Sequence, residues 1–152
     1  MIYCRVRSIS CADAGPLYFV PRKSTINAAH YLKILQQHLL PSIVAHSCTT
    51  FQQDSAYAHT AVLVKRQLEE NYVNVLAPWP GNSPDLNPIK NCWAMVKKKV
   101  AELQPTSLTN LEAKVRQVRE TEVTAELCSL LSRSMLDHFT AVIKARGGPT
   151  KY

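Results

Sequence analysis

Residues 51–93 decide how this chain folds, and they read FQQDSAYAHTAVLVKRQLEENYVNVLAPWPGNSPDLNPIKNCW. The stretch opens with a short apolar and polar run that predicts a β-strand, and Asp54 follows it directly. It closes with the loop Ser83-Pro84-Asp85-Leu86-Asn87-Pro88. This loop predicts the start of a helix, because Asn87 can cap the first turn and the proline after it fits the first helical position.

Acidic residues on two such elements would form a divalent metal site if the fold brought them together at the end of a sheet. Asp54 supplies the first of these acids, but the position where a second acid is expected holds Lys90. Two acids placed in this way would make a nuclease-like arrangement, of which this stretch supplies one acid.

Apolar periodicity and turn residues place the other elements around this stretch. We expect a hairpin first, then helices alternating with strands, then three consecutive helices, which makes the fold class α/β. Pro41 is expected to end or interrupt the first helix, which Thr25 or Asn27 can cap, and Gly81-Asn82 predicts a turn. The expected strands are 2–9, 16–21, 49–53 and 73–76, and the expected helices are 28–40, 59–71, 88–103, 109–123 and 125–144. In the helix at 59–71 the spacing of Ala61, Val62, Val64 and Leu68 predicts burial on one side, and Trp93 is expected on the inner face of the helix at 88–103.

Composition limits the class of protein further. The chain has 152 residues, of which 46% are apolar and 19% are charged, so one globular domain is expected. Its net charge of +7 favours a polyanionic partner such as nucleic acid. Five cysteines without a CxxC pair are typical of a reduced intracellular protein, and no apolar run is long enough for a membrane span. We therefore expect no membrane partner.

Several short motifs occur in an order that resembles a known family. They are Gly15-Pro16-Leu17, Asn27-Ala28 with Tyr31, Leu39-Leu40-Pro41, Phe51-Gln52-Gln53-Asp54, His59-Thr60-Ala61, Trp79-Pro80, Ser83 to Ile89, Trp93, and Ala141 to Lys144 with the closing Thr150-Lys151-Tyr152. Together they resemble the C-terminal part of the catalytic DDE domain of Tc1/mariner transposases, in the Tc1-like branch. The resemblance covers the chain from about residue 9 to its end.

The resemblance implies an RNase H-like fold in which three acids hold two Mg²⁺ ions for attack on a DNA phosphodiester. Asp54 matches the second of these acids and is the expected Mg²⁺ ligand, whereas Lys90 occupies the position of the third. The first acid of the family lies upstream of this chain, on the central strand of the sheet. We therefore expect an incomplete RNase H-like domain at 1–104, with the central first strand missing, and additional C-terminal helices at 105–152. Such a chain would have unpaired strand edges, so we expect marginal stability, closure of the gap by the segment that begins at Met1, or association with a partner.

The replacement of the third acid by Lys90 argues against catalysis, because an ammonium group repels a cation by several kcal/mol at low effective dielectric. We expect a truncated, inactive remnant that does not bind Mg²⁺ stably. Ser55 and Tyr57 also replace an asparagine and a proline typical of the family. His59 either contacts the site or makes a structural hydrogen bond, and Asp85 is interpreted as a turn and capping residue.

The partner expected from these features is DNA, bound weakly and without sequence specificity, with Lys97, Lys98 and Lys99 as candidate phosphate contacts. Two alternatives remain open. One is a Mg²⁺-dependent transposase or endonuclease whose missing acid comes from another chain. The other is a non-catalytic module that associates with intact transposase or with itself through its C-terminal helices. A nuclear location is expected in each case.

Overall fold

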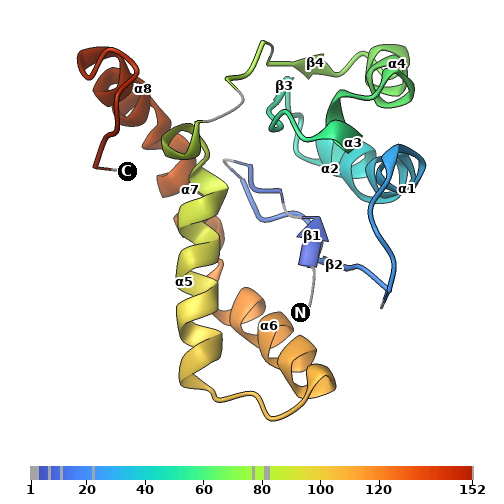
Figure 1. Cartoon of the computed structure of the whole chain (residues 1–152), viewed down its shortest axis with the longest axis vertical. Helices are drawn as coiled ribbons and strands as arrows, with labels where there is room; N and C mark the ends of the chain where they lie inside the picture. The colour runs from blue at the N-terminus through green and yellow to red at the C-terminus, as the bar shows by residue number, and fades with distance from the viewer. Residues whose placement is uncertain are drawn as a thin grey trace. The chain divides into compact units, whose positions relative to one another are not determined.

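The computed structural model describes residues 4–6, 8–10, 12–21, 23–76, 78–80 and 83–151. They form two compact units, the first made of Met1–Val6 with Gly15–Asn82 and the second of Arg7–Ala14 with Ser83–Tyr152. Figure 1 shows the elements of each unit, with strands confined to the first and the longest helices in the second. Residues 1–3 and 7 of the expected first strand, and the expected turn at Gly81-Asn82, lie outside the described residues.

The described strands of the first unit pair in two short sheets. β1 (Cys4–Val6) lies antiparallel to β2 (Tyr18–Phe19), which confirms the predicted hairpin. β3 (Thr50–Phe51) lies parallel to β4 (Asn74–Val75), with Thr50 opposite Asn74 and Phe51 opposite Val75. All four strands are shorter than predicted, so Asp54 lies in the loop after β3 rather than directly at the strand end.

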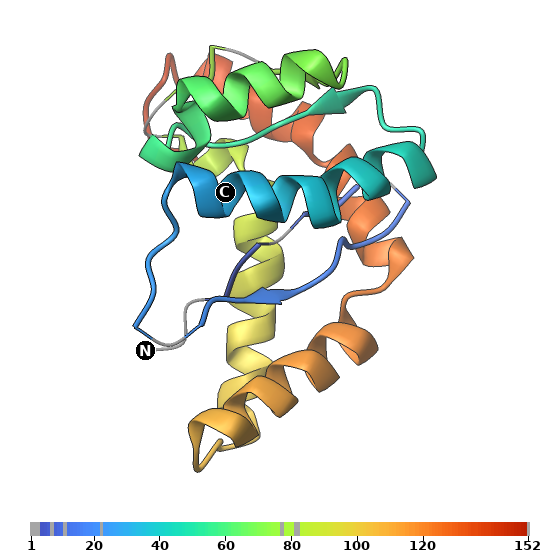
Figure 2. The same ribbon diagram turned by 90° about the vertical axis from the view of Figure 1, so that its right-hand side faces the viewer.

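The first helical segment passes through Pro41 instead of ending there. α1 (Ala28–Ile34) is capped by Asn27, whose Oδ1 accepts from the His30 amide at 2.8 Å. A π-helical turn, η1 (Leu35–Leu39), then leads into α2 (Leu40–Ala45), with Pro41 in its first turn. A proline clashes with the carbonyl four residues earlier in a regular helix, and the wider π-turn relieves this clash. Figure 2 shows the three segments as one continuous rod, coloured blue to cyan.

The prediction of one continuous helix at 59–71 is wrong, because the structure has two helices there. α3 (Tyr57–Thr60) and α4 (Val62–Glu70) are separated by Ala61, whose ψ of 141° is extended. The break places His59 in α3 and turns the Val62 side chain outward, where it is 82% exposed instead of buried. Val64 and Leu68 are fully buried, as predicted from their spacing.

The core of the first unit lies where α1 and η1 pack against α4. Tyr31, Leu35, Leu39, Val64 and Leu68 form this core, and Phe51 and Val75 of the parallel strands pack on its edge. Burying each such side chain contributes about 1.5–3 kcal/mol. The core therefore ties the rod to the strand that precedes Asp54.

The second unit consists mainly of four helices. They are α5 (Pro88–Glu102), α6 (Leu108–Glu122), α7 (Ala125–Arg133) and α8 (Met135–Lys144), preceded by the 3₁₀ turn η2 (Pro84–Leu86). The predicted helix 125–144 is divided at Ser134. Pro88 occupies the start of α5 as predicted, but Asn87 makes no capping hydrogen bond with its side chain, so that part of the prediction is wrong.

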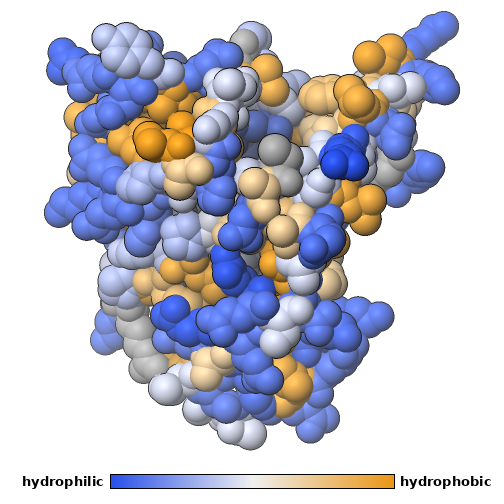
Figure 3. Space-filling model, turned by 180° about the vertical axis from the view of Figure 1, so that it is seen from behind, coloured by the Kyte–Doolittle hydropathy of each residue, from blue (hydrophilic) through white to orange (hydrophobic). Residues whose placement is uncertain are grey.

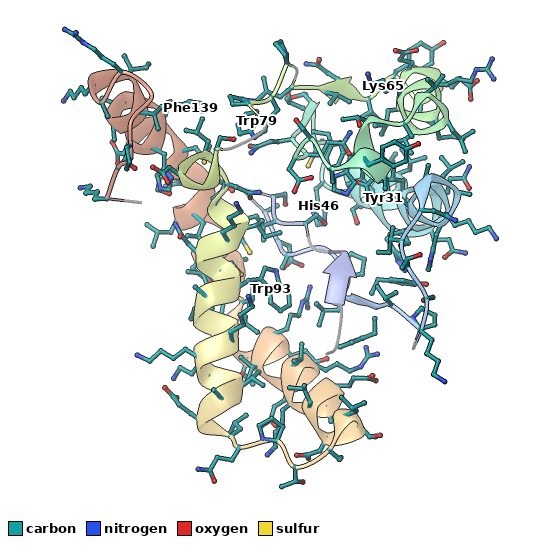
Figure 4. The ribbon with its side chains drawn as sticks, in the orientation of Figure 1. Tyr31, His46, Lys65, Trp79, Trp93 and Phe139 are labelled. Atoms are coloured by element: carbon teal, nitrogen blue, oxygen red, sulfur yellow. The ribbon has the colours of Figure 1, made fainter. Side chains whose placement is uncertain are left out.

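One face of α5 forms the core of the second unit. Cys92, Trp93, Val96 and Val100 are buried there, and α6 and α7 pack against the helix. Trp93, labelled in Figure 4, is buried and therefore lies on the core-facing side of α5, as predicted. Within the described residues, no helix combines the length and apolar character that a membrane crossing requires.

Candidate functional site

Asp54 lies in the loop between β3 and α3, in a turn that its own side chain stabilises. Its Oδ1 accepts a hydrogen bond from the Ala56 amide at 3.1 Å, the geometry of an Asx-turn. Ser55 donates its hydroxyl to the Trp79 carbonyl at 3.1 Å, which ties the same loop to the segment after β4. The Asp54 side chain stays 54% exposed, so its carboxylate is accessible from solvent.

His59 is the residue that the fold brings to Asp54. Its Nδ1 lies 2.7 Å from Asp54 Oδ1, which is ion-pair distance, although the direction of approach is outside that of a hydrogen bond. The Tyr31 ring packs against the imidazole, with ring centroids 4.2 Å apart and planes tilted by 31°. The sequence left open whether His59 contacts the site or makes a structural hydrogen bond. The structure places it beside Asp54 without a hydrogen bond from Nδ1, and a role in a site stays a prediction.

Gln53 completes a polar network around His59, a role that the sequence did not predict. The Tyr31 hydroxyl donates to Gln53 Oε1 at 3.0 Å, and Gln53 Nε2 donates to the His59 carbonyl at 3.2 Å. Burial, with a smaller contribution from the Asp54 carboxylate, raises the pKa of Tyr31, so its hydroxyl remains a donor at neutral pH. Figure 4 labels Tyr31, on α1 where this helix meets α3. The only signal in the sequence was the position of Gln53 immediately before Asp54.

The lysines singled out from the sequence belong to the second unit. Lys90 is the third residue of α5, and its side chain is exposed. Lys97, Lys98 and Lys99 follow on the same helix and are also exposed. The structure therefore groups Asp54 with His59 in one unit, and Lys90 with the three later lysines in the other.

Asp85 anchors the C-terminal tail to the turn before α5. Its Oδ2 accepts from the Thr150 amide at 2.9 Å and from the Thr150 hydroxyl at 2.7 Å. These hydrogen bonds hold the pKa of Asp85 below its usual value. The Asp85 carbonyl accepts from Nδ1 of the buried His138 at 2.6 Å. Asp85 is thus a turn residue as interpreted, but its partners lie far along the chain, and His138 gave no signal in the sequence.

The residues around Asp54 do not fit a two-metal centre. Such a centre needs several oxygen ligands to fix two ions about 4 Å apart. Asp54 supplies one carboxylate, and the side chain beside it is the His59 imidazole rather than a second acid. In the described part of the chain, no group of three His, Cys, Asp or Glu side chains could hold a metal ion.

Solved structures with the same fold identify the structural class. The catalytic domain of Mos1 transposase, solved with Raltegravir and Mn, superposes with a TM-score of 0.81 over 93% of this chain and 74% of that domain. The Mos1 mariner paired end complex with Mn gives 0.83 over 94% of this chain and 43% of that one. Sequence identity is 20% in both cases, so the likeness defines the fold, which is the RNase H-like DDE fold that the sequence predicted.

Sequence comparison adds the family. A family model described as DDE superfamily endonuclease matches residues 9–112. The Transposable element Tcb1 transposase of Caenorhabditis briggsae is 35% identical over 149 residues, 94% of this chain and 52% of that protein. The Tc3 transposase of Caenorhabditis elegans is 29% identical over 133 residues, 85% of this chain and 40% of that protein. The chain therefore belongs to the DDE superfamily, as a domain of the Tc1/mariner transposase type, and it spans about half or less of these relatives.

Proposed function

We propose that this chain is a Tc1-like DDE domain that does not cleave DNA and that keeps a weak, non-specific affinity for the DNA backbone. The observation that carries the proposal is Lys90, which follows Asn87-Pro88-Ile89 where the family pattern has its third acid. An ammonium group at a metal-ligand position removes a ligand and adds a repulsive charge. In this proposal Asp54 is the second acid of the family, and it is held by His59 rather than by a cation.

Affinity for DNA is supported by charge. The chain carries 18 basic and 11 acidic residues, and Lys97, Lys98 and Lys99 are exposed on α5. Lysines contact phosphates as mobile point charges, so this affinity has no sequence preference and decreases steeply with salt. The proposal includes a nuclear location, with residues 1–104 as the DDE-type domain and 105–152 as its helical extension.

A plasmid-nicking assay in Mn²⁺ tests the loss of cleavage. We expect no nicking above background by the purified chain, and no difference between wild type and Asp54→Ala. Nicking that Asp54→Ala abolishes would contradict the proposal and support the alternative, a metal-dependent transposase or endonuclease. Nicking that Asp54→Ala leaves unchanged would indicate a contaminating nuclease, which a further purification step removes.

Exposed apolar side chains on the C-terminal helices favour a second candidate, an interaction module that pairs with intact transposase. Leu130 of α7 is 65% exposed, and Leu136 and Ile143 of α8 are 76% and 74% exposed. Figure 3 shows apolar side chains in orange over the part of the surface that carries α8, at the upper right. Co-purification with an intact Tc1-like transposase, lost in Leu136→Ser/Ile143→Ser but retained in the exposed control Val44→Ser, would support this role. Absence of co-purification would exclude it.

A further inference from the structure

Three of the lysines on α5 share one face of the helix. Lys97 and Lys98 follow Lys90 by seven and eight residues, which is about two helical turns and about 10–12 Å along the axis. At about 100° per residue, the three side chains leave the helix within an arc of about 100°. The buried positions Cys92, Trp93, Val96 and Val100 occupy a separate arc of α5, and this helix packs against α6 and α7.

Positive charge gathers on this face, and among the described residues no acid forms an ion pair with it. Lys90, Lys97 and Lys98 are exposed, and none of them forms an ion pair within the described residues. The positions between them on the face are Ala94 and Ala101, both exposed.

Two acids lie near the face, and neither pairs with a lysine. The Asp85 carboxylate interacts electrostatically with Lys90, but its hydrogen bonds go to Thr150. Glu102 lies at the edge of the face, four residues after Lys98, without an ion pair at 4.0 Å or less among the described residues.

Lys99 does not belong to this face. It leaves the helix about 100° beyond Lys98, away from Lys90 and Lys97. Lys97, Lys98 and Lys99 are consecutive in the sequence, but only Lys97 and Lys98 lie on this face of the helix. Lys90, distant in sequence, joins the first two.

We infer that Lys90, Lys97 and Lys98 form a binding face for the phosphates of duplex DNA. Duplex DNA carries one negative charge per about 1.7 Å of its axis, so a face about 10–12 Å long meets several phosphates. Lysine suits this contact, because its flexible stem lets the ammonium group follow the backbone. The inference rests on the proposed DNA affinity and gives Lys90 a role of its own. The base at the position of the third acid contributes to binding, whereas an acid there would repel the same phosphates.

Charge-matched triple variants test the face. Lys90→Gln/Lys97→Gln/Lys98→Gln removes the face, and Lys33→Gln/Lys65→Gln/Lys144→Gln removes three exposed lysines from elsewhere. Both variants have the same net charge, so a difference between them reports position rather than total charge. Far-UV circular dichroism and thermal unfolding check that both remain folded. Binding to a fluorescent duplex of mixed sequence is measured by anisotropy across a series of KCl concentrations.

Each phosphate contact contributes about 0.9 to the slope of log K against log salt, so the face variant is expected to lose about 2–3 units of slope. Its affinity at low salt is expected to fall by about tenfold or more, while the control triple keeps a slope within about one unit of the wild type. Lys90→Glu is expected to weaken binding more than Lys90→Gln, because it adds repulsion to the loss of a contact.

The outcomes separate this inference from the proposed function. If the wild type binds and the two triple variants lose the same affinity and slope, the face is wrong and general DNA affinity stands. If the wild type does not bind duplex DNA at low salt, both proposals fail. Binding in which Lys90→Glu equals or exceeds the wild type would also overturn a role for Lys90.

Discussion

Replacing His138 with leucine is expected to loosen the turn that precedes α5. His138 is 2% exposed, and its Nδ1 donates to the Asp85 carbonyl at 2.6 Å. A carbonyl can only accept, so Nδ1 carries the proton in this arrangement. Leucine is of similar size and fills most of the space, but it has no donor. The substitution therefore removes this hydrogen bond, together with a longer contact between Nε2 and the Ser134 hydroxyl at 3.4 Å, while it keeps most of the packing.

The magnitude follows from leaving the half-buried Asp85 carbonyl without this donor. Removing the donor to a buried carbonyl costs about 1–3 kcal/mol, more than the net value of an ordinary hydrogen bond. Burying leucine in place of a polar ring offsets part of this loss, because the imidazole no longer has to be desolvated. We expect the unsatisfied carbonyl to dominate and the second unit to lose about 1–2 kcal/mol of unfolding free energy.

Urea unfolding followed by tryptophan fluorescence measures this change. In a Trp79→Phe background Trp93, which is buried in the second unit, is the one tryptophan of the chain, so the signal reports on that unit. His46→Leu is the matched control, since His46 is exposed on the surface of the first unit and the chemical change is the same. The control is expected to stay within about 0.5 kcal/mol of the parent. An unchanged or higher urea midpoint for His138→Leu would show that this hydrogen bond does not stabilise the second unit.

Three further changes follow from burial and charge. Leu68→Ala is expected to destabilise the first unit by about 2–5 kcal/mol, whereas Val62→Ala, at a position 82% exposed, stays within about 0.5 kcal/mol by urea unfolding. Hydrogen bonds from the tail hold the pKa of Asp85 below its usual 3.8, so its stabilisation is present above pH 3.8 and is lost as the pH falls through the lower folded value. Asp85→Asn should therefore lower the urea midpoint at pH 6, and an equal difference at pH 2 would contradict this assignment. Burial raises the pKa of the Cys128 thiol to about 11, so iodoacetamide at pH 8 should label the half-buried Cys48 faster, as peptide mass spectrometry would show.

The sequence predicted the elements whose signals are local. Asn27 before α1, Pro88 at the start of α5 and the spacing of Val64 and Leu68 were correct, because capping, proline geometry and helical periodicity act within one or two turns. The family motifs located Asp54 in the same way, although its identity as a metal-site acid stays a prediction.

The differences arise where tertiary packing overrides local preference. Pro41 does not end the first helical segment, because a π-turn before it absorbs the steric conflict. Ala61 breaks the helix predicted at 59–71 despite the high helix propensity of alanine. No periodicity or spacing links Asp85 to His138 and Thr150, which are 53 and 65 residues later in the chain. Contacts of that separation depend on the fold and cannot be read from local sequence.

Manganese binding measured by electron paramagnetic resonance tests most directly whether this DDE domain has lost its metal centre. Free Mn²⁺ gives a six-line signal that decreases on binding, so a titration counts the bound ions. Because we propose that Lys90 takes the position of the third acid, and because Asp54 lies beside His59, we expect no stoichiometric binding at millimolar Mn²⁺ and no difference between wild type and Asp54→Ala. Binding of one or two ions per chain that Asp54→Ala abolishes would contradict the account.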